Sequence, residues 1–181
     1  VVIPAGTWNT GAIELKSGVN LVIEEGATLR FAFEPKLYPL VRTSWEGLAC
    51  WNYSPCIYAY QAKDIAITGK GTIDGGGNND TWWQWNGNPR FGFKAGVTTE
   101  SQKLGSRSKL LKQAEDGVAF DERKFGMGQG LRPQLINFVR SERILIKDVK
   151  MINSPFWVIH PLLCKNITVD GVYIWNEGPN G

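Results

Sequence analysis

Apolar side chains recur along the chain in a short pattern that four segments share. In residues 144–151 they are spaced by two, three and two positions, and residues 167–174 repeat this spacing 23 positions later. Residues 65–74 and 21–29 carry looser copies. A spacing of two places both side chains on one face of a β-strand, and a spacing of three inserts one residue at a bend. The pattern therefore predicts strands that turn a corner and keep their apolar side chains inward.

The length of the repeat indicates a solenoid. A coil of about 23 residues cannot bury its apolar face alone, whereas stacked coils share one core and pair through parallel sheets. Polar residues stand before the strands, where turns are expected: Asn20, Asp64, Arg143 and Asn166. The alternative is a sandwich of antiparallel strands, in which Ile144 and Ile167 would not stack on each other. We expect one all-β domain over residues 1–181, with the architecture of a parallel β-helix.

The repeat is interrupted between residues 75 and 130. The glycine-rich residues 75–80 predict a loop, and residues 99–116 predict a short helix that ends at Gly117. A strand pattern returns at residues 131–138. We expect residues 75–130 to form an insertion of loops and a short helix on one face of the solenoid, and insertions of this kind often carry binding sites.

Composition narrows the classes of function without identifying one. The 181 residues include 43% hydrophobic and 20% charged side chains, which is typical of a globular protein. A net charge of +3, with no basic cluster interleaved with aromatic residues, argues against a nucleic-acid partner and slightly favours a polyanionic ligand. No apolar run reaches the length of a membrane span. The eight tryptophans can fill a core or line a sugar-binding groove.

Residues that would support common catalytic or metal chemistry are scarce. The sequence contains no GxSxG, P-loop or HExxH motif, and its one histidine, His160, has no activating serine nearby. Three cysteines at irregular positions predict neither a disulfide framework nor a zinc site. Pairing of Cys50 with Cys56 across a short loop stays open. We therefore expect no metal and no cofactor.

Seven short segments carry a further signal through their order along the chain. They are residues 3–8, 15–21, 25–27, 71–75, 131–133, 153–161 and 176–181. Together they resemble landmarks of glycoside hydrolase family 28, the polygalacturonases, and most resemble bacterial exo-acting members. The resemblance implies a right-handed parallel β-helix, a pectin-lyase-like solenoid, that hydrolyses α-1,4-galacturonosidic linkages with inversion and without a metal. It also implies an acidic plant cell-wall polysaccharide, pectin or galacturonan, as the partner. Such a polymer is too large to enter a cytoplasm, which favours a secreted or periplasmic location.

The resemblance also predicts where the catalytic residues lie. Family members use three aspartates, the first within an Asn-x-Asp segment, and Asn180-Gly181 matches only the first two positions of that segment. Inverting hydrolysis needs two carboxyl groups about 6.5–9.5 Å apart, one to protonate the leaving oxygen and one to activate water. We therefore expect an N-terminal part, truncated at both ends and inactive alone, with the catalytic aspartates after Gly181. Four aspartates of the chain itself are expected to face solvent or to lie in turns: Asp64, Asp74, Asp148 and Asp170.

Four residues are candidates for substrate binding. His160 precedes Asn180 by 20 positions, close to one coil, so the two should lie on neighbouring coils near the same face. Trp157 offers a ring for sugar stacking, with core packing as its alternative. Arg132 offers a guanidinium for bidentate pairing with a uronate carboxylate, with a loop salt bridge as its alternative. Structural roles, at a strand end for His160 and in a turn for Asn180, also stay open.

Other functions fit the same fold, because a fold does not choose a substrate. One alternative is a non-catalytic β-solenoid that binds polysaccharide. A second is hydrolysis of rhamnogalacturonan or xylogalacturonan by the same machinery. A third is a polysaccharide lyase, which would require calcium and a basic residue for β-elimination.

Overall fold

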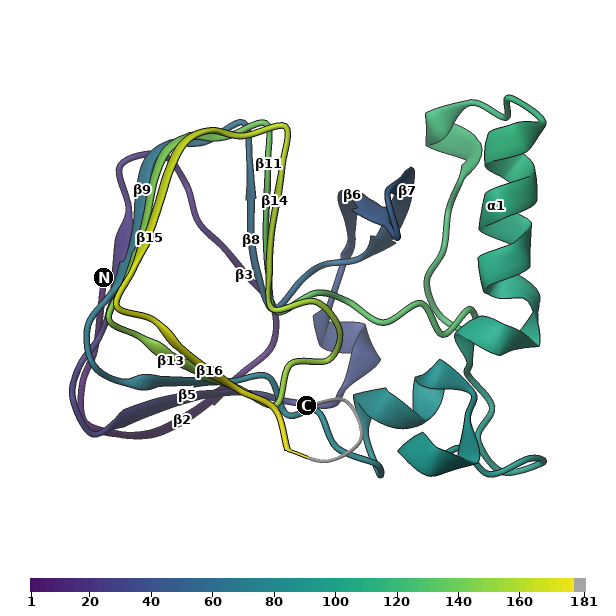
Figure 1. The fold of residues 1–181 in the computed structure, drawn as a ribbon, viewed down its shortest axis with the longest axis horizontal. Coiled ribbons are helices and arrows are strands. Elements are labelled where there is room, and N and C mark those ends of the chain that lie inside the picture. The colour runs from purple at the N-terminus through teal and green to yellow at the C-terminus, as the bar shows by residue number, and fades with distance from the viewer. Residues whose placement is uncertain (178–181) are drawn as a thin grey trace.

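Three parallel sheets form the faces of a β-helix in the computed structural model, which describes residues 1–177 (Figure 1). The first sheet contains, in spatial order, β1 (Val2–Ile3), β4 (Asn20–Ile23), β9 (Lys63–Thr68), β12 (Glu142–Lys147) and β15 (Lys165–Asp170). The second sheet contains β2 (Gly6–Thr10), β5 (Ala27–Phe31), β10 (Thr72–Asp74), β13 (Lys150–Ile152) and β16 (Tyr173–Trp175). The third sheet contains β3 (Ile13–Glu14), β8 (Ile57–Tyr60), β11 (Ile136–Val139) and β14 (Ile159–Leu162).

The register stacks each coil on the next, as the repeat predicts. Ile144 pairs with Ile65 in the preceding coil and with Ile167 in the following one. Two positions further along β12, Ile146 pairs with Ile67 and with Val169 in the same way. All strand pairs of the three sheets are parallel. The right-handed parallel β-helix is therefore confirmed, and the sandwich of antiparallel strands is wrong.

Inward side chains of successive coils form one apolar core. From the first sheet, Leu21, Ile67 and Ile146 are each at most 2% exposed. The second and third sheets add side chains that are as deeply buried, among them Ile73 and Ile57. Because a coil presents its apolar residues to the coils on either side, most of its stability comes from those neighbours.

A left-handed residue marks the corner where the third sheet passes into the first. Three successive coils carry one there, with φ between +51° and +55°: Gln61, Arg140 and Leu163. The predicted turn residues follow three positions later, with φ between +54° and +56°: Asp64, Arg143 and Asn166. In the first coil the left-handed residue is Gly18 (φ +77°), and Asn20 lies in β4. Three coils therefore turn this corner with the same backbone conformation.

A β-hairpin leaves the β-helix between β5 and β8, and the sequence pattern did not predict it. It follows a 3₁₀ turn at Pro35–Leu37 and consists of β6 (Leu40–Trp45) and β7 (Leu48–Tyr53), which pair antiparallel. The hairpin stands out from the third sheet (Figure 1).

The segment between β10 and β11 contains short turns and one helix, α1 (Arg107–Glu115). The turns are 3₁₀ helices at Trp82–Asn86, Pro89–Phe91 and Phe120–Glu122, with a π-type turn at Gln102–Ser106. The helix begins later than the predicted residue 99, because Gly105 (φ +109°) breaks the preceding turn. It ends before Gly117 (φ +71°), as predicted. This segment lies on the same side of the β-helix as the hairpin (Figure 1).

The hairpin and the segment around α1 share a small second core. Its buried side chains are Trp45, Cys50, Leu110, Phe125 and Leu131. Cys50 belongs to this cluster and Cys56 to the main core, and both are free thiols, so the Cys50–Cys56 pair does not form. Burial raises the pKa of Cys50 to about 12 and also raises that of Cys56, which keeps both thiols protonated.

Replacing Ile146 with alanine tests whether the stacked row stabilises the fold. Ile146 is 1% exposed and packs between two coils. We expect Ile146→Ala to lower the free energy of unfolding by about 2–5 kcal/mol, as for other buried large-to-small changes. Lys147→Ala is the control, because Lys147 lies next to it on the same strand and is exposed. The control should change stability by less than about 0.5 kcal/mol. Equal losses in urea unfolding would contradict the stacked core.

Candidate functional site

The outer face of the third sheet carries a row of polar side chains from three coils. Tyr58 of β8, Asn137 of β11 and His160 of β14 are paired in register. Their neighbours Ile57 and Ile136 are fully buried in the core. Since side chains alternate along a strand, the register that stacks the core also places these polar side chains next to one another.

Asn137 orients the imidazole of His160. Its Nδ2 donates to the backbone oxygen of His160 at 2.6 Å and lies 3.3 Å from His160 Nδ1. A carbonyl oxygen can only accept, so the bond to His160 O identifies the nitrogen end of the amide, and Oδ1 accepts from Thr43 Oγ1 at 2.8 Å. Nδ1 of His160 is then the acceptor, and the ring proton lies on Nε2. The imidazole therefore keeps one donor, Nε2–H, for a further partner.

The surroundings of His160 favour its neutral form. Burial lowers the pKa of the imidazole below the ordinary value of 6.5. At neutral pH, His160 is therefore a hydrogen-bonding group and carries no fixed charge.

A column of aromatic rings leads from the hairpin to His160. Trp45 stacks on Phe156 with centroids 5.2 Å apart, and Phe156 stacks on Trp157 at 5.2 Å. The Trp157 ring then meets His160 edge-on at 4.9 Å. Trp157 is 41% exposed, so one part of its ring packs against Phe156 while another part faces solvent. A partly exposed tryptophan beside a polar donor suits the apolar face and the hydroxyl edge of a sugar.

Arg132 lies beneath this column and is only 4% exposed. Its guanidinium carbon is 5.0 Å from the centre of the Phe156 ring, and its NH1 donates to the backbone oxygen of Pro155 at 3.2 Å. Nε donates to Gln102 Oε1 at 3.3 Å. Burial lowers its pKa to about 10, although the charge of Glu46 acts in the opposite direction. The guanidinium therefore supports the aromatic column from below, and no salt bridge holds it among the described residues.

Two of the four predicted binding residues, Trp157 and His160, thus lie in direct contact. Arg132 reaches them only through Phe156. Asn180 lies outside the described residues, and its place beside His160 stays a prediction.

Asp74 is buried, so the expectation that it could face solvent is wrong. It is 5% exposed and accepts from Gly76 N, Asn153 Nδ2 and Arg30 Nε, each at 3.0 Å. These bonds hold the loop after β10 against the loop after β13. Asp74 and Glu177 also line a cleft of about 470 Å³ at this end of the second sheet. The other three aspartates are exposed, as expected: Asp64, Asp148 and Asp170.

The described residues show neither a metal centre nor a membrane helix. Within residues 1–177, no three His, Cys, Asp or Glu side chains are grouped so that they could hold a metal ion. In the same part of the chain, no helix has both the length and the apolar character needed to cross a membrane.

Sequence reasoning missed Asn137, Thr43 and Phe156. Asn137 precedes His160 by 23 positions, the length of the repeat, so the periodicity itself was a signal that the two side chains pair. Thr43 and the partner of Phe156, Trp45, belong to the unpredicted hairpin and carried no comparable signal.

The pH dependence of stability tests the environment of His160. Its pKa is lower in the folded state, so the unfolded state binds more protons as the pH falls below 6.5. The stability contribution is therefore present above 6.5 and is lost as the pH falls through the folded-state pKa. Between about pH 7.5 and about pH 5, wild type should lose more unfolding free energy than His160→Gln does. Equal losses in urea unfolding would show that burial does not perturb the imidazole.

Comparisons with known proteins agree with the fold. No protein-family model matches the chain. A curated protein of Vitis vinifera described as "Probable polygalacturonase" is 28% identical over 178 residues, which are 95% of this chain and 28% of that protein. The crystal structure of a hyperthermoactive exopolygalacturonase from Thermotoga maritima matches with a TM-score of 0.94 and 40% identity. That match covers 99% of this chain and 40% of the Thermotoga chain.

A family 28 exopolygalacturonase from Yersinia enterocolitica shares the fold, with a TM-score of 0.65 and 22% identity over 99% of this chain and 34% of its own. The chain thus spans less than half the length of each of these relatives. Over nearly all of its residues, the chain resembles in sequence and in fold the polygalacturonases of glycoside hydrolase family 28.

Proposed function

We propose that these residues belong to an inverting glycoside hydrolase that cleaves α-1,4-galacturonosidic linkages of pectin. The observation that carries the proposal is the pairing of Trp157 with His160 on the outer face of a fold that matches an exopolygalacturonase at 40% identity. An exposed ring and a neutral donor are suited to an uncharged sugar face and its hydroxyl groups.

The described side chains supply binding and orientation in this proposal. Nε2–H of His160 donates to a sugar hydroxyl or carboxylate, and Trp157 stacks on the sugar ring. Arg132 fixes Phe156, on which Trp157 rests, and so acts as a positioning residue. Asn180 binds a hydroxyl or orients the residue that follows Gly181.

The two carboxyl groups that inverting hydrolysis requires would follow Gly181 in a longer protein. One would donate a proton to the leaving oxygen, and the other would activate water on the opposite face of the sugar. Residues 1–181 alone are then inactive. We further propose one β-helix domain with residues 75–130 as an insertion on one face, and a secreted or periplasmic location, because the polymeric substrate cannot enter a cytoplasm.

The reaction can be tested on the protein as its gene encodes it. We expect reducing ends to appear from polygalacturonate in the presence of a metal chelator, and NMR to show a product of inverted anomeric configuration. Rhamnogalacturonan and xylogalacturonan serve as alternative substrates. Unsaturated uronates that disappear on chelation would indicate a calcium-dependent lyase. Binding without cleavage of any of the three polymers would indicate a non-catalytic solenoid.

Substitution of His160 tests its place in the site. We expect His160→Ala to lower kcat/KM on polygalacturonate about 3- to 10-fold, the effect of losing one hydrogen bond to substrate, while the protein stays folded. His160→Gln should restore part of the loss, since its amide can donate from a similar position. A rate equal to that of wild type in both variants would assign His160 a purely structural role.

A further inference from the structure

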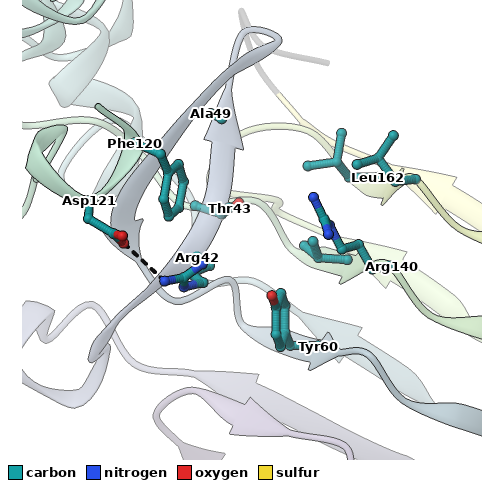
Figure 2. A pocket seen from close by; sticks show the side chains of 10 residues that line it. Arg42, Thr43, Ala49, Tyr60, Phe120, Asp121, Arg140 and Leu162 are labelled. Carbon is teal, nitrogen blue, oxygen red and sulfur yellow. Dashed lines mark hydrogen bonds and ion pairs between the residues drawn. The ribbon is translucent and has the colours of Figure 1, made fainter. Parts of the chain in front are cut away.

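A separate pocket of about 370 Å³ lies between the hairpin and the outer face of the third sheet (Figure 2). Its lining includes Arg42 and Thr43 from β6, Tyr60 from β8, and Leu162 from β14. Arg140 borders it from the corner after β11. We call it the Arg42–Arg140 pocket. The three predicted binding residues within residues 1–177 do not line it: Arg132, Trp157 and His160.

Arg140 gives the pocket an uncompensated positive charge. Its side chain is exposed, and no salt bridge engages its guanidinium among residues 1–177. Its backbone N donates to Leu162 O at 2.8 Å, which holds the corner in place. Figure 2 shows the guanidinium beside Leu162 and on the same side of the sheet as Tyr60.

Arg42 is held rigidly on the opposite wall. Its NH2 donates to Asp121 Oδ1 at 3.0 Å, and its guanidinium carbon lies 5.2 Å from the centre of the Trp51 ring and 5.0 Å from that of Phe120. Its backbone oxygen accepts from Tyr58 OH at 2.6 Å. Two arginines and one aspartate line the pocket, so the lining has a net charge of +1.

The rest of the lining is aromatic and aliphatic. Tyr60 and Phe120 present rings to the pocket, and Leu162 lies near Arg140 (Figure 2). Val139 adds another aliphatic side chain to the lining. A single negative charge on a ring with an apolar face would match both the free guanidinium and these walls. We propose that the Arg42–Arg140 pocket binds a uronic acid residue of the polysaccharide, with its carboxylate on Arg140.

The pocket lies on the same face as the His160 row. Tyr60, Val139 and Leu162 are paired in register, two positions along their strands from Tyr58, Asn137 and His160. Two positions along a strand correspond to about 6.6 Å, so one acidic oligosaccharide can reach both places. The identity of the sugar rests on the proposed function, whereas the charge and the shape of the pocket do not depend on it.

Binding of digalacturonate to the complete protein tests the proposal. We expect Arg140→Gln to weaken the affinity about 5- to 10-fold in calorimetry, as for loss of one charge-assisted hydrogen bond at an exposed site. Arg140→Lys should lose less, because it keeps the charge but not the bidentate geometry. Arg143→Gln is the matched control: its guanidinium, three residues on, is already paired with Asp64 at 2.6 and 2.8 Å, so this variant should bind as wild type does.

Two further measurements separate this pocket from the His160 row and from the hydrolase activity. The loss caused by Arg140→Gln should persist in a His160→Ala background, and a neutral digalactoside should bind wild type and Arg140→Gln equally weakly. Two results would contradict uronate binding in the pocket, even if polygalacturonate is hydrolysed. One is equal affinity of wild type and Arg140→Gln for digalacturonate, and the other is no binding by wild type. If binding depends on Arg140 but the protein cleaves no galacturonan, the result supports uronate binding by the pocket and contradicts the proposed hydrolase activity.

Discussion

The parallel pairing of equivalent residues in successive coils is the constraint on which the other features depend. Ile144 lies between Ile65 and Ile167, so its contacts are made with coils on both sides. Because side chains alternate along a strand, a slip of one residue would turn this row outward and bring its polar neighbours into the core. The buried row therefore fixes the register of the outer face. The same register places Asn137 beside His160 at hydrogen-bonding distance.

The site nevertheless depends on more than the β-helix. Thr43 lies on the hairpin and fixes the Asn137 amide, and Trp45 of the same hairpin begins the aromatic column that ends at Trp157. Arg132 has no carboxylate partner among the described residues, and a buried cation is costly unless other groups stabilise it. A carbonyl, an amide oxygen and the face of Phe156 supply that stabilisation. The hairpin and the β-helix are thus joined through side chains of the candidate site.

Features that repeat were predictable from the sequence, and features that occur once were not. The spacing around Ile144 and Ile167 predicted the coil, its register and its core, because each copy reports the same local geometry. Residues 40–53 have the length and composition of strands, so nothing local distinguishes a hairpin that leaves the β-helix from another coil. The burial of Asp74 depends on donors from distant segments, Arg30 and Asn153, which only the fold brings together. The partial exposure of Trp157 likewise depends on residues that pack against it in the fold, Phe156 and His160.

The left-handed corner has a consequence for how such a protein can change. A non-glycine residue in this conformation costs about 1–2 kcal/mol, and three successive coils bear this strain at Gln61, Arg140 and Leu163. The side chains of Arg140 and Leu163 border the Arg42–Arg140 pocket and take no part in the buried rows. Glycine in place of Arg140 would relieve strain and remove the guanidinium from the pocket, whereas another long side chain would change the pocket lining without disturbing the core. At this corner, thermal tolerance and the chemistry of the pocket can therefore be exchanged at a single residue.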